Sequence, residues 1–133
     1  GKIGWGDPQI DSLIKDNPQI KVFGYVPEEE LPVLYSQSTC LIYPSLYEGF
    51  GLPVLEAFAC GCPVVASNVS SLPEVAGDAA ILVDPYNEHS ILEGIEKAIK
   101  QSKSLRQKGY KREKLYSWHK AASQTLKVYQ ESQ

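Results

Sequence analysis

The chain has 133 residues, of which 43% are hydrophobic and 22% are charged, and its formal net charge is -3. This length is enough for one globular domain with a real core, but too short for two domains of ordinary size. The composition excludes a disordered or collagen-like protein. No apolar run approaches the roughly 20 residues that span a bilayer, and the first residues lack the pattern of a signal peptide. We therefore expect a soluble, cytoplasmic protein.

Basic residues are distributed unevenly along the chain. No Lys or Arg occurs from Val22 to Glu96, a segment that contains eleven of the sixteen acidic residues. This distribution argues against nucleic acid or an anionic membrane as a partner of that segment. Between Lys97 and Lys120 basic residues alternate with apolar ones at helical spacing. We interpret them as a solvated helix face in preference to a membrane-surface patch.

The three cysteines are Cys40, Cys60 and Cys62. Their number is odd, and with two distant histidines they cannot supply four zinc ligands at the spacing of a zinc finger. We expect reduced structural thiols.

The first predicted elements are a strand and a helix. The β-rich segment from Gln19 to Gly24 predicts a strand that runs into a loop. A helix is expected next, because Pro27 and the three acids at 28–30 suit the N-terminal end of a helix. Its buried stripe would consist of Leu31, Leu34 and Tyr35.

The middle of the chain alternates between apolar strands and helices. Continuous apolar runs predict strands at 40–43, 62–67 and 79–83, each covered on both faces in a parallel sheet. A helix should begin at Pro53 and stop at Gly61. A second helix should follow Ser71, which we expect to cap it together with Glu74 three residues later.

Three helices are predicted in the C-terminal part. Asn87 and Ser117 are expected to cap the first and the last of them. The segment 105–116 between these two should be helical with a weak point at Gly109. The expected apolar faces are Ile91, Leu92, Ile95, Ala98 and Ile99 on the first helix, and Trp118, Ala121, Ala122, Leu126 and Tyr129 on the last. The whole pattern predicts an α/β domain with a parallel sheet.

A glycine-containing loop at 48–53 (EGFGLP) precedes the helix predicted from Pro53. In α/β sheets, ligands bind at the carboxyl ends of the strands, where such loops and the next helix present free N–H groups. Gly49 and Gly51 remove side chains where backbone can approach a ligand. The N–H groups around Phe50, Leu52 and Val54 could then bind phosphate or hydroxyl oxygens.

Two glutamates flank this loop. Glu56, expected in the first helical turn, could accept two ribose hydroxyls, and Glu48 could accept hydroxyls of a group beyond the phosphates. Alternatively, the two carboxyls could be the acid/base pair of a glycosidase, which requires one of them to be protonated. A helix N-terminus at the site would oppose that protonation. A third interpretation is a tight strand-to-helix connection without a ligand.

Four segments, VFGYVPEEELPVLY, PSLYEGFGLPVLEAFACGCPVVAS, LPEVAGDAAILVDP and SWHKAA, resemble the group 1 glycosyltransferases of sequence family 4. The resemblance covers nearly the whole chain. It is to the C-terminal, nucleotide-sugar-binding domain of the two-domain GT-B fold, whose hallmark of Glu, seven residues, Glu is met by Glu48 and Glu56. The resemblance implies a Rossmann-like parallel sheet flanked by helices. Residues 1–133 would be a truncated C-terminal, donor-binding half whose N-terminal acceptor domain is missing.

The resemblance also implies a function in polysaccharide biosynthesis. This would be the retaining transfer of a hexosyl group from a nucleotide diphosphate sugar to an acceptor hydroxyl, without a metal or other cofactor. Glu48 would be catalytic and contact donor-sugar hydroxyls, and Glu56 would hold the ribose. The remaining donor-binding residues would be Gly49, Phe50, Gly51, Leu52 and Val54 on the sugar and diphosphate, and Gly24, Tyr25 and Val26 beside the base.

Two departures from the family pattern bear on activity. Family members place an Arg and a Lys on the diphosphate from a segment that GKIGW resembles, and here Lys2 is the only cation near that place. The acceptor domain is missing as well. We therefore expect the isolated chain to be inactive. For the full-length enzyme, peripheral membrane association is a further expectation. The alternative is a non-catalytic nucleotide-binding or interaction module with the same fold.

Overall fold

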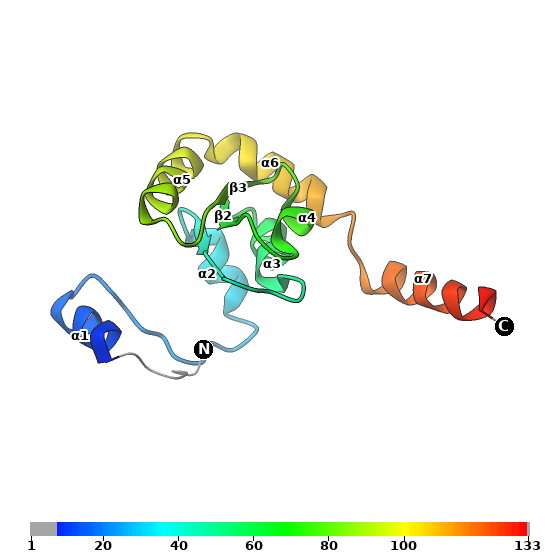
Figure 1. The fold of residues 1–133 in the computed structure, drawn as a ribbon, viewed down its shortest axis with the longest axis horizontal. Coiled ribbons are helices and arrows are strands. Elements are labelled where there is room, and N and C mark those ends of the chain that lie inside the picture. Colours follow the sequence, from blue (N-terminus) through cyan, green and yellow to red (C-terminus); the bar gives the residue numbers. More distant parts are fainter. Residues whose placement is uncertain (1–7, 133) are drawn as a thin grey trace. The chain divides into compact units, whose positions relative to one another are not determined.

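The computed structural model describes residues 8–132, which form parts of two compact units, Gly1–Leu31 and Pro32–Gln133 (Figure 1). The first unit contains helix α1 (Pro8–Asp16) and the irregular segment that follows it. The predicted loop at GKIGW, with Lys2, lies outside the described residues.

The strand predicted from Gln19 to Gly24 is wrong. Residues 20–24 are irregular, and the Phe23 side chain is 65% exposed. A β-rich sequence supplies suitable side chains, but a strand also needs a neighbouring strand to exchange backbone hydrogen bonds. Within the described residues, the sheet has three strands instead of the four expected.

The second unit is built on a parallel sheet of three strands in the order β1, β2, β3: Leu41–Tyr43, Val64–Ser67 and Ala80–Val83. Leu41 is paired with Val64, and Val64 with Ala80. All four residues of β2 are buried, as its continuous apolar sequence predicts for a central strand covered on both faces. The predicted parallel α/β arrangement is confirmed.

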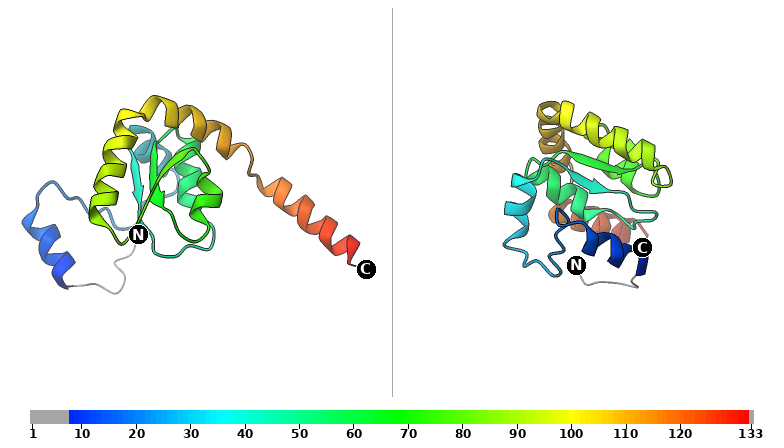
Figure 2. Two further views of the ribbon diagram at one scale, coloured as in Figure 1. Left: turned by 45° about the horizontal axis from the view of Figure 1, so that its top comes forward. Right: turned by 90° about the vertical axis from the view of Figure 1, so that its left-hand side faces the viewer.

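Helices cover both faces of this sheet (Figure 2). On one face, α3 (Leu52–Ala59) and α4 (Leu72–Ala76) pack Phe58 and Leu72 against Val64 and Ala66 of β2. On the other face, α5 (Glu88–Lys100) and α6 (Ser102–Glu113) pack Ala98 and Leu105 against Val65. Helix α3 begins at Leu52, one residue before the predicted start at Pro53, and the predicted stop, Gly61, follows its last turn with a φ of +68°.

Helix α2 (Leu31–Gln37) begins later than predicted. Residues 28–30 form a turn before it, so the three acids are not in its first turn. Pro32 accounts for this start, because proline is accommodated in the first turn, where its missing N–H leaves no bond unmade. Of the predicted buried stripe, Leu34 is exposed and Leu31 is half-buried. Tyr35 packs against the core.

Two helical glycines mark close packing. On α5 the buried residues are Gly94 and Ala98, whereas Leu92 and Ile99 of the predicted face are exposed. On α6, Gly109 is not a weak point: a Cβ there would lie 2.9 Å from Cδ1 of Phe58, so the glycine lets α6 approach α3. Both corrections come from contacts between elements, which the periodicity of a single helix cannot report.

The predicted caps of α5 and α7 (Trp118–Glu131) are confirmed. The Asn87 side chain accepts from Ser90 N, and the Ser117 side chain accepts from Lys120 N. The predicted apolar face of α7 is not part of the core, since this helix has no buried residue and Trp118 is 81% exposed. Among the described helices, none is long and apolar enough to cross a membrane.

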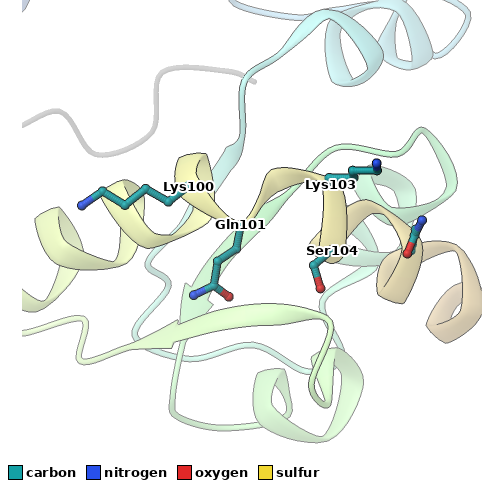
Figure 3. Close-up of a pocket in the computed structure, with 5 residues that line it drawn as sticks. Lys100, Gln101, Lys103 and Ser104 are labelled. Atoms are coloured by element: carbon teal, nitrogen blue, oxygen red, sulfur yellow. The ribbon is translucent and has the colours of Figure 1, made fainter.

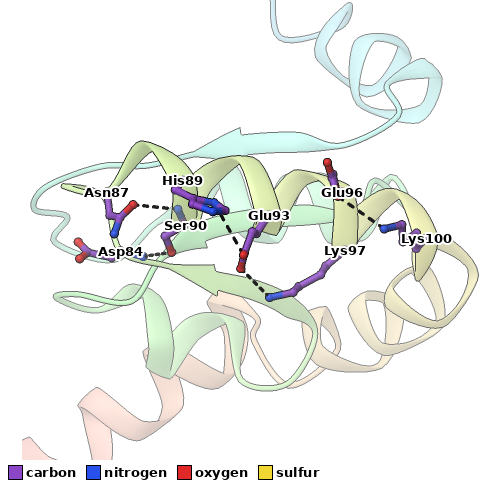
Figure 4. Close-up of polar contacts among 8 residues, drawn as sticks. All are labelled: Asp84, Asn87, His89, Ser90, Glu93, Glu96, Lys97 and Lys100. Atoms are coloured by element: carbon purple, nitrogen blue, oxygen red, sulfur yellow. Dashed lines mark hydrogen bonds and ion pairs between the residues drawn. The ribbon is translucent and has the colours of Figure 1, made fainter.

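Lysines on the outer side of α5 are paired with acids one turn away (Figure 4). Lys97 contacts Glu93 at 3.3 Å, and Lys100 contacts Glu96 at 3.5 Å. On α6, Lys108 lies 3.0 Å from Asp78 and lowers the pKa of that carboxyl. These exposed pairs agree with a solvated helix face. Cys40, Cys60 and Cys62 are free thiols, as expected.

Candidate functional site

The candidate site is formed by the loops that follow β1 and β2. Because these strands are parallel neighbours, both loops leave the same edge of the sheet. The first loop runs from Pro44 to Gly51 and contains Glu48, and the second runs from Asn68 to Ser71. This is the carboxyl edge at which ligands bind in α/β folds.

Two serines of the second loop hold the backbone of the first. Ser70 Oγ accepts a hydrogen bond from the Glu48 N–H at 3.2 Å. The same hydroxyl donates to the Glu48 carbonyl oxygen at 2.5 Å. Ser71 Oγ lies within donating distance of the carbonyl oxygens of Glu48 (3.0 Å) and Phe50 (2.9 Å). The predicted capping bond from Ser71 is wrong: it precedes α4, but its hydroxyl is turned to the glycine loop.

The two glycines of the loop have different roles. Gly51 has a φ of +102°, and a Cβ there would lie 2.6 Å from Cδ2 of Leu72, so only glycine fits. At Gly49 an added Cβ would meet no atom within 4 Å among the described residues. The space beside Gly49 is therefore open to a ligand, whereas the space beside Gly51 is filled by the core.

Backbone donors without a partner occur in the loop and at the start of α3. Within the described part of the chain, the N–H groups of Gly49, Phe50, Gly51 and Leu52 have no hydrogen-bond partner. Val54 differs, because its N–H donates to the Gly51 carbonyl at 3.0 Å and its side chain is fully buried. The Val54 amide is thus already used inside the first turn of the helix, and its contact with a donor stays a prediction.

Glu48 is held by a tyrosine at the end of β1. Tyr43 Oη donates to Glu48 Oε1 at 2.6 Å. Burial raises the pKa of Tyr43, and so does its hydrogen bond to Glu48. The phenol therefore remains a donor at neutral pH, and it fixes the orientation of the carboxylate.

Glu56 is held in the same way. The sequence predicts Glu56 in the first turn of α3, but it lies in the second turn. Tyr35 Oη, on α2, donates to Glu56 Oε2 at 3.1 Å. Burial, and then the Glu56 carboxylate, raise the pKa of Tyr35 well above its ordinary value of 10. The Glu56 carboxylate also raises the pKa of Tyr43, after burial and the neighbouring Glu48.

Tyr35 and Tyr43 are site residues that the sequence analysis missed. Tyr35 was assigned to a buried stripe and Tyr43 to a buried strand. Their partners are 21 and 5 residues away, and no local pattern connects a phenol to a carboxylate across such separations. The available signal was a tyrosine at the carboxyl end of a predicted strand, where ligand sites occur.

These phenols predict a pH dependence of stability. Their pKa values are raised on folding, so their contribution is complete below pH 10 and is lost as pH rises beyond it. The free energy of unfolding should therefore fall as the pH rises above 10. Denaturant titrations from pH 8 to 11 measure this.

The matched variants are Tyr35→Phe with Tyr43→Phe, which should flatten the profile, and the exposed Tyr129→Phe, which should not. Parallel profiles for all variants and the unmodified chain would show that the two phenols are not coupled to folding.

No Lys or Arg among the described residues has a hydrogen bond or ion pair with the glycine loop. Arg112 is engaged elsewhere: its Nε donates to the Val75 carbonyl at 3.0 Å, and its guanidinium also binds the Glu74 carbonyl. The guanidinium lies 5.6 Å from the ring centre of Tyr116. Nor do the described residues contain a group of three or more His, Cys, Asp or Glu that could hold a metal ion.

Two pockets lie on the second unit. A pocket of about 510 Å³ borders the glycine loop and α3, and Glu56, Phe50 and Trp118 are among the residues that line it. Phe50 also contacts the Tyr116 ring edge to face at 5.8 Å. A pocket of about 490 Å³ lies at the junction of α5 and α6 (Figure 3), lined by Lys100, Gln101, Lys103, Ser104 and Gln107. The second pocket contains none of the predicted site residues.

Gly24, Tyr25 and Val26, predicted beside the base, belong to the first unit. Gly24 has a φ of +65°, and Tyr25 is 75% exposed. Their contribution to a base site stays a prediction.

Comparison with known proteins gives named relatives. O-antigen chain mannosyltransferase B of Escherichia coli is 43% identical over 136 residues, which cover 97% of this chain and 35% of that protein. MMP alpha-(1->4)-mannosyltransferase of Mycolicibacterium hassiacum is 36% identical over 79% of this chain and 27% of its own length. The chain thus spans about a third of the length of these curated relatives.

Solved structures agree on the fold. Sucrose-phosphate synthase from Thermosynechococcus elongatus superposes with a TM-score of 0.81 and 29% identity, over 96% of this chain and 37% of that chain. The catalytic domain of starch synthase IV from Arabidopsis thaliana, bound to ADP and acarbose, has a TM-score of 0.73 at 18% identity, over 93% and 28%. The expected fold class, a parallel sheet with flanking helices as in GT-B glycosyltransferases, is confirmed.

The sequence profile of the family described as "Glycosyl transferases group 1" matches residues 12–115. This range includes all three strands, the glycine loop and both glutamates. The chain therefore belongs to the group 1 glycosyl transferases.

Proposed function

We propose that this chain is the donor-binding half of a retaining glycosyltransferase of sequence family 4. The full protein would transfer a hexosyl group from a nucleotide diphosphate sugar to an acceptor hydroxyl. The observation that carries this proposal is the row of N–H groups at Gly49 to Leu52, which have no partner among residues 8–132 and are flanked by Glu48 and Glu56. Donors for phosphate oxygens thus lie between two acceptors for sugar hydroxyls.

Each part of the site has a task in this reaction. The loop N–H groups and the positive end of α3 would bind the diphosphate and stabilise the charge that develops on it as it leaves. Glu48 would accept hydrogen bonds from donor-sugar hydroxyls, and Glu56 from the ribose. Because Tyr43 and Tyr35 fix the two carboxylates, little reorganisation is needed on binding.

Relatives suggest the class of sugar. The two relatives given above are named mannosyltransferases, one of them an O-antigen chain mannosyltransferase. We therefore propose a mannosyl donor and a cytoplasmic role in the synthesis of a polysaccharide. The acceptor site would come from another domain of the full-length protein, which would also mediate any peripheral membrane contact. The cations that the described loop lacks would come from the segment of the donor-binding domain that GKIGW resembles. We propose no metal or other cofactor.

The alternative of a glycosidase is less well supported. Both glutamates accept hydrogen bonds from phenols, an arrangement suited to ionised carboxylates, whereas a glycosidase needs one protonated carboxyl. A binding module without transfer activity remains the second candidate, and the lack of a cation on the described loop favours it. Transfer from GDP-mannose by the full-length protein, and its loss on Glu48→Gln, would decide for the enzyme.

The direct test is calorimetric titration of the chain with GDP, UDP and ADP. We expect one of them to bind, and Glu56→Gln to weaken binding about ten-fold through loss of the charged acceptor. Glu93→Gln, at an exposed position on α5, is the matched control and should bind as the unmodified chain does. No binding of any of the three nucleotides would refute an autonomous donor site.

A further inference from the structure

We propose that Ser70 and Ser71 are positioning residues that aim the N–H groups of Gly49 and Gly51 at the donor diphosphate. This inference rests on the proposed function. It assigns a task to two hydroxyls that sequence analysis treats as part of a connection and a helix cap.

Peptide geometry sets the direction of two N–H groups of the glycine loop. A trans peptide group is planar, and its C=O and N–H point in opposite directions. The Glu48 carbonyl is directed at the hydroxyls of Ser70 and Ser71, so the Gly49 N–H, in the same peptide group, points away from the serines. The Phe50 carbonyl is directed at Ser71, so the Gly51 N–H also points away from them.

The two N–H groups therefore share one side of the loop. They come from alternate residues, and neither has a hydrogen-bond partner within the described part of the chain. Backbone N–H groups exposed on one side of a loop are suited to binding an anion. The open space at Gly49 lies beside these donors, so phosphate oxygens can approach them without displacing a side chain.

The backbone of Ser70 supports a specific role for its hydroxyl. Ser70 has a φ of +60° and is the one non-glycine residue with a positive φ between residues 8 and 132. Glycine would adopt this conformation without steric cost. Serine adds a hydroxyl that accepts from the Glu48 N–H and donates to the Glu48 carbonyl, so it holds Glu48 from both sides of its backbone.

Glu48 is consequently fixed at both ends. Ser70 and Ser71 hold its backbone, and Tyr43 holds its carboxylate. The two serine hydroxyls thus determine the position of the Glu48 backbone and the direction of the N–H groups that would bind the diphosphate. Loss of a serine should therefore weaken contacts with the diphosphate and leave contacts with the base unchanged.

The test is a titration of the chain and its variants with GDP, UDP and ADP and with the matched nucleosides guanosine, uridine and adenosine. Ser71→Ala should weaken binding of the preferred nucleoside diphosphate about ten-fold and leave its nucleoside unaffected. Ser71→Thr keeps the hydroxyl and should restore binding. Ser104→Ala, at an exposed serine of α6, should behave as the unmodified chain does.

Ser70→Gly separates positioning from stability. This variant loses the hydroxyl but relieves the positive-φ strain, so its thermal midpoint should be maintained or raised while binding of the diphosphate falls. A purely structural serine would instead change affinity and stability together. If Ser71→Ala does not fold, Ser70→Gly alone decides.

The outcomes distinguish the two proposals. If the unmodified chain binds none of the three diphosphates, the proposed function fails for this chain and the inference fails with it. If the unmodified chain binds one, and Ser71→Ala and Ser70→Gly bind it equally well, only the inference is overturned. An equal loss for the diphosphate and its nucleoside would also overturn it, because the effect would not be directed at the phosphates.

Discussion

Replacing Gly51 with alanine should destabilise the chain by about 2–4 kcal/mol, whereas the same change at Gly49 should alter stability by no more than about 0.5 kcal/mol. At Gly51 two costs add up. An alanine would be held at a φ of +102°, and its Cβ would lie 2.6 Å from the fully buried Leu72. At Gly49 the new methyl group meets no atom within 4 Å among the described residues. Denaturant unfolding of the two variants measures the difference.

The same pair of variants separates fold from function. Gly49→Ala should weaken binding of a nucleoside diphosphate, because its methyl group would occupy the open space where the ligand approaches the loop N–H groups. If the Gly51→Ala variant were as stable as the unmodified chain, the Leu72 side chain would be shown to move aside readily. Undiminished binding by Gly49→Ala would show that the open space is not used by the ligand.

Replacing Gly94 with alanine should destabilise the chain by about 2 kcal/mol. A Cβ at this position would lie 2.4 Å from Cγ1 of Val83 and 3.2 Å from Cγ1 of Val65, both fully or nearly fully buried strand residues. Alanine raises helix propensity by about 1 kcal/mol, but the helix would have to move off the sheet to admit it. Urea unfolding measures the change.

The control for this prediction lies two residues away on the same helix. Leu92→Ala should change stability by no more than about 0.5 kcal/mol, because Leu92 is 57% exposed. A Gly94→Ala variant as stable as the unmodified chain would mean that α5 can shift from the sheet at little cost. The close packing inferred at this glycine would then be wrong.

The features that the sequence predicts well are those specified locally. The continuous apolar run of β2, Pro53 at the start of α3, and the side chains of Asn87 and Ser117 at helix starts each act through near neighbours. The glycine loop and its position after a strand are readable for the same reason. These local signals suffice for the parallel α/β fold and for the location of the candidate site.

The features that the sequence does not predict depend on partners far along the chain. The segment from Gln19 has the composition of a strand, but the described sheet gives it no neighbour. Ser71 looks like a helix cap until the loop carbonyls that it bonds are brought beside it by the pairing of β1 and β2. Tyr35 reaches Glu56 across 21 residues, and Gly94 is required by two strands that its helix covers.

The measurement that tests the central claim most directly is a map of backbone amide shifts in the ¹⁵N-labelled chain, recorded as the preferred nucleoside diphosphate is added. We predict that the largest shifts fall on the amides of Gly49, Phe50, Gly51 and Leu52, whose N–H groups have no partner in the described part of the chain. The amide of Val54, already bonded to Gly51, should shift less. Largest shifts at Lys100 and Lys103, in the pocket between α5 and α6, would contradict the proposed donor site.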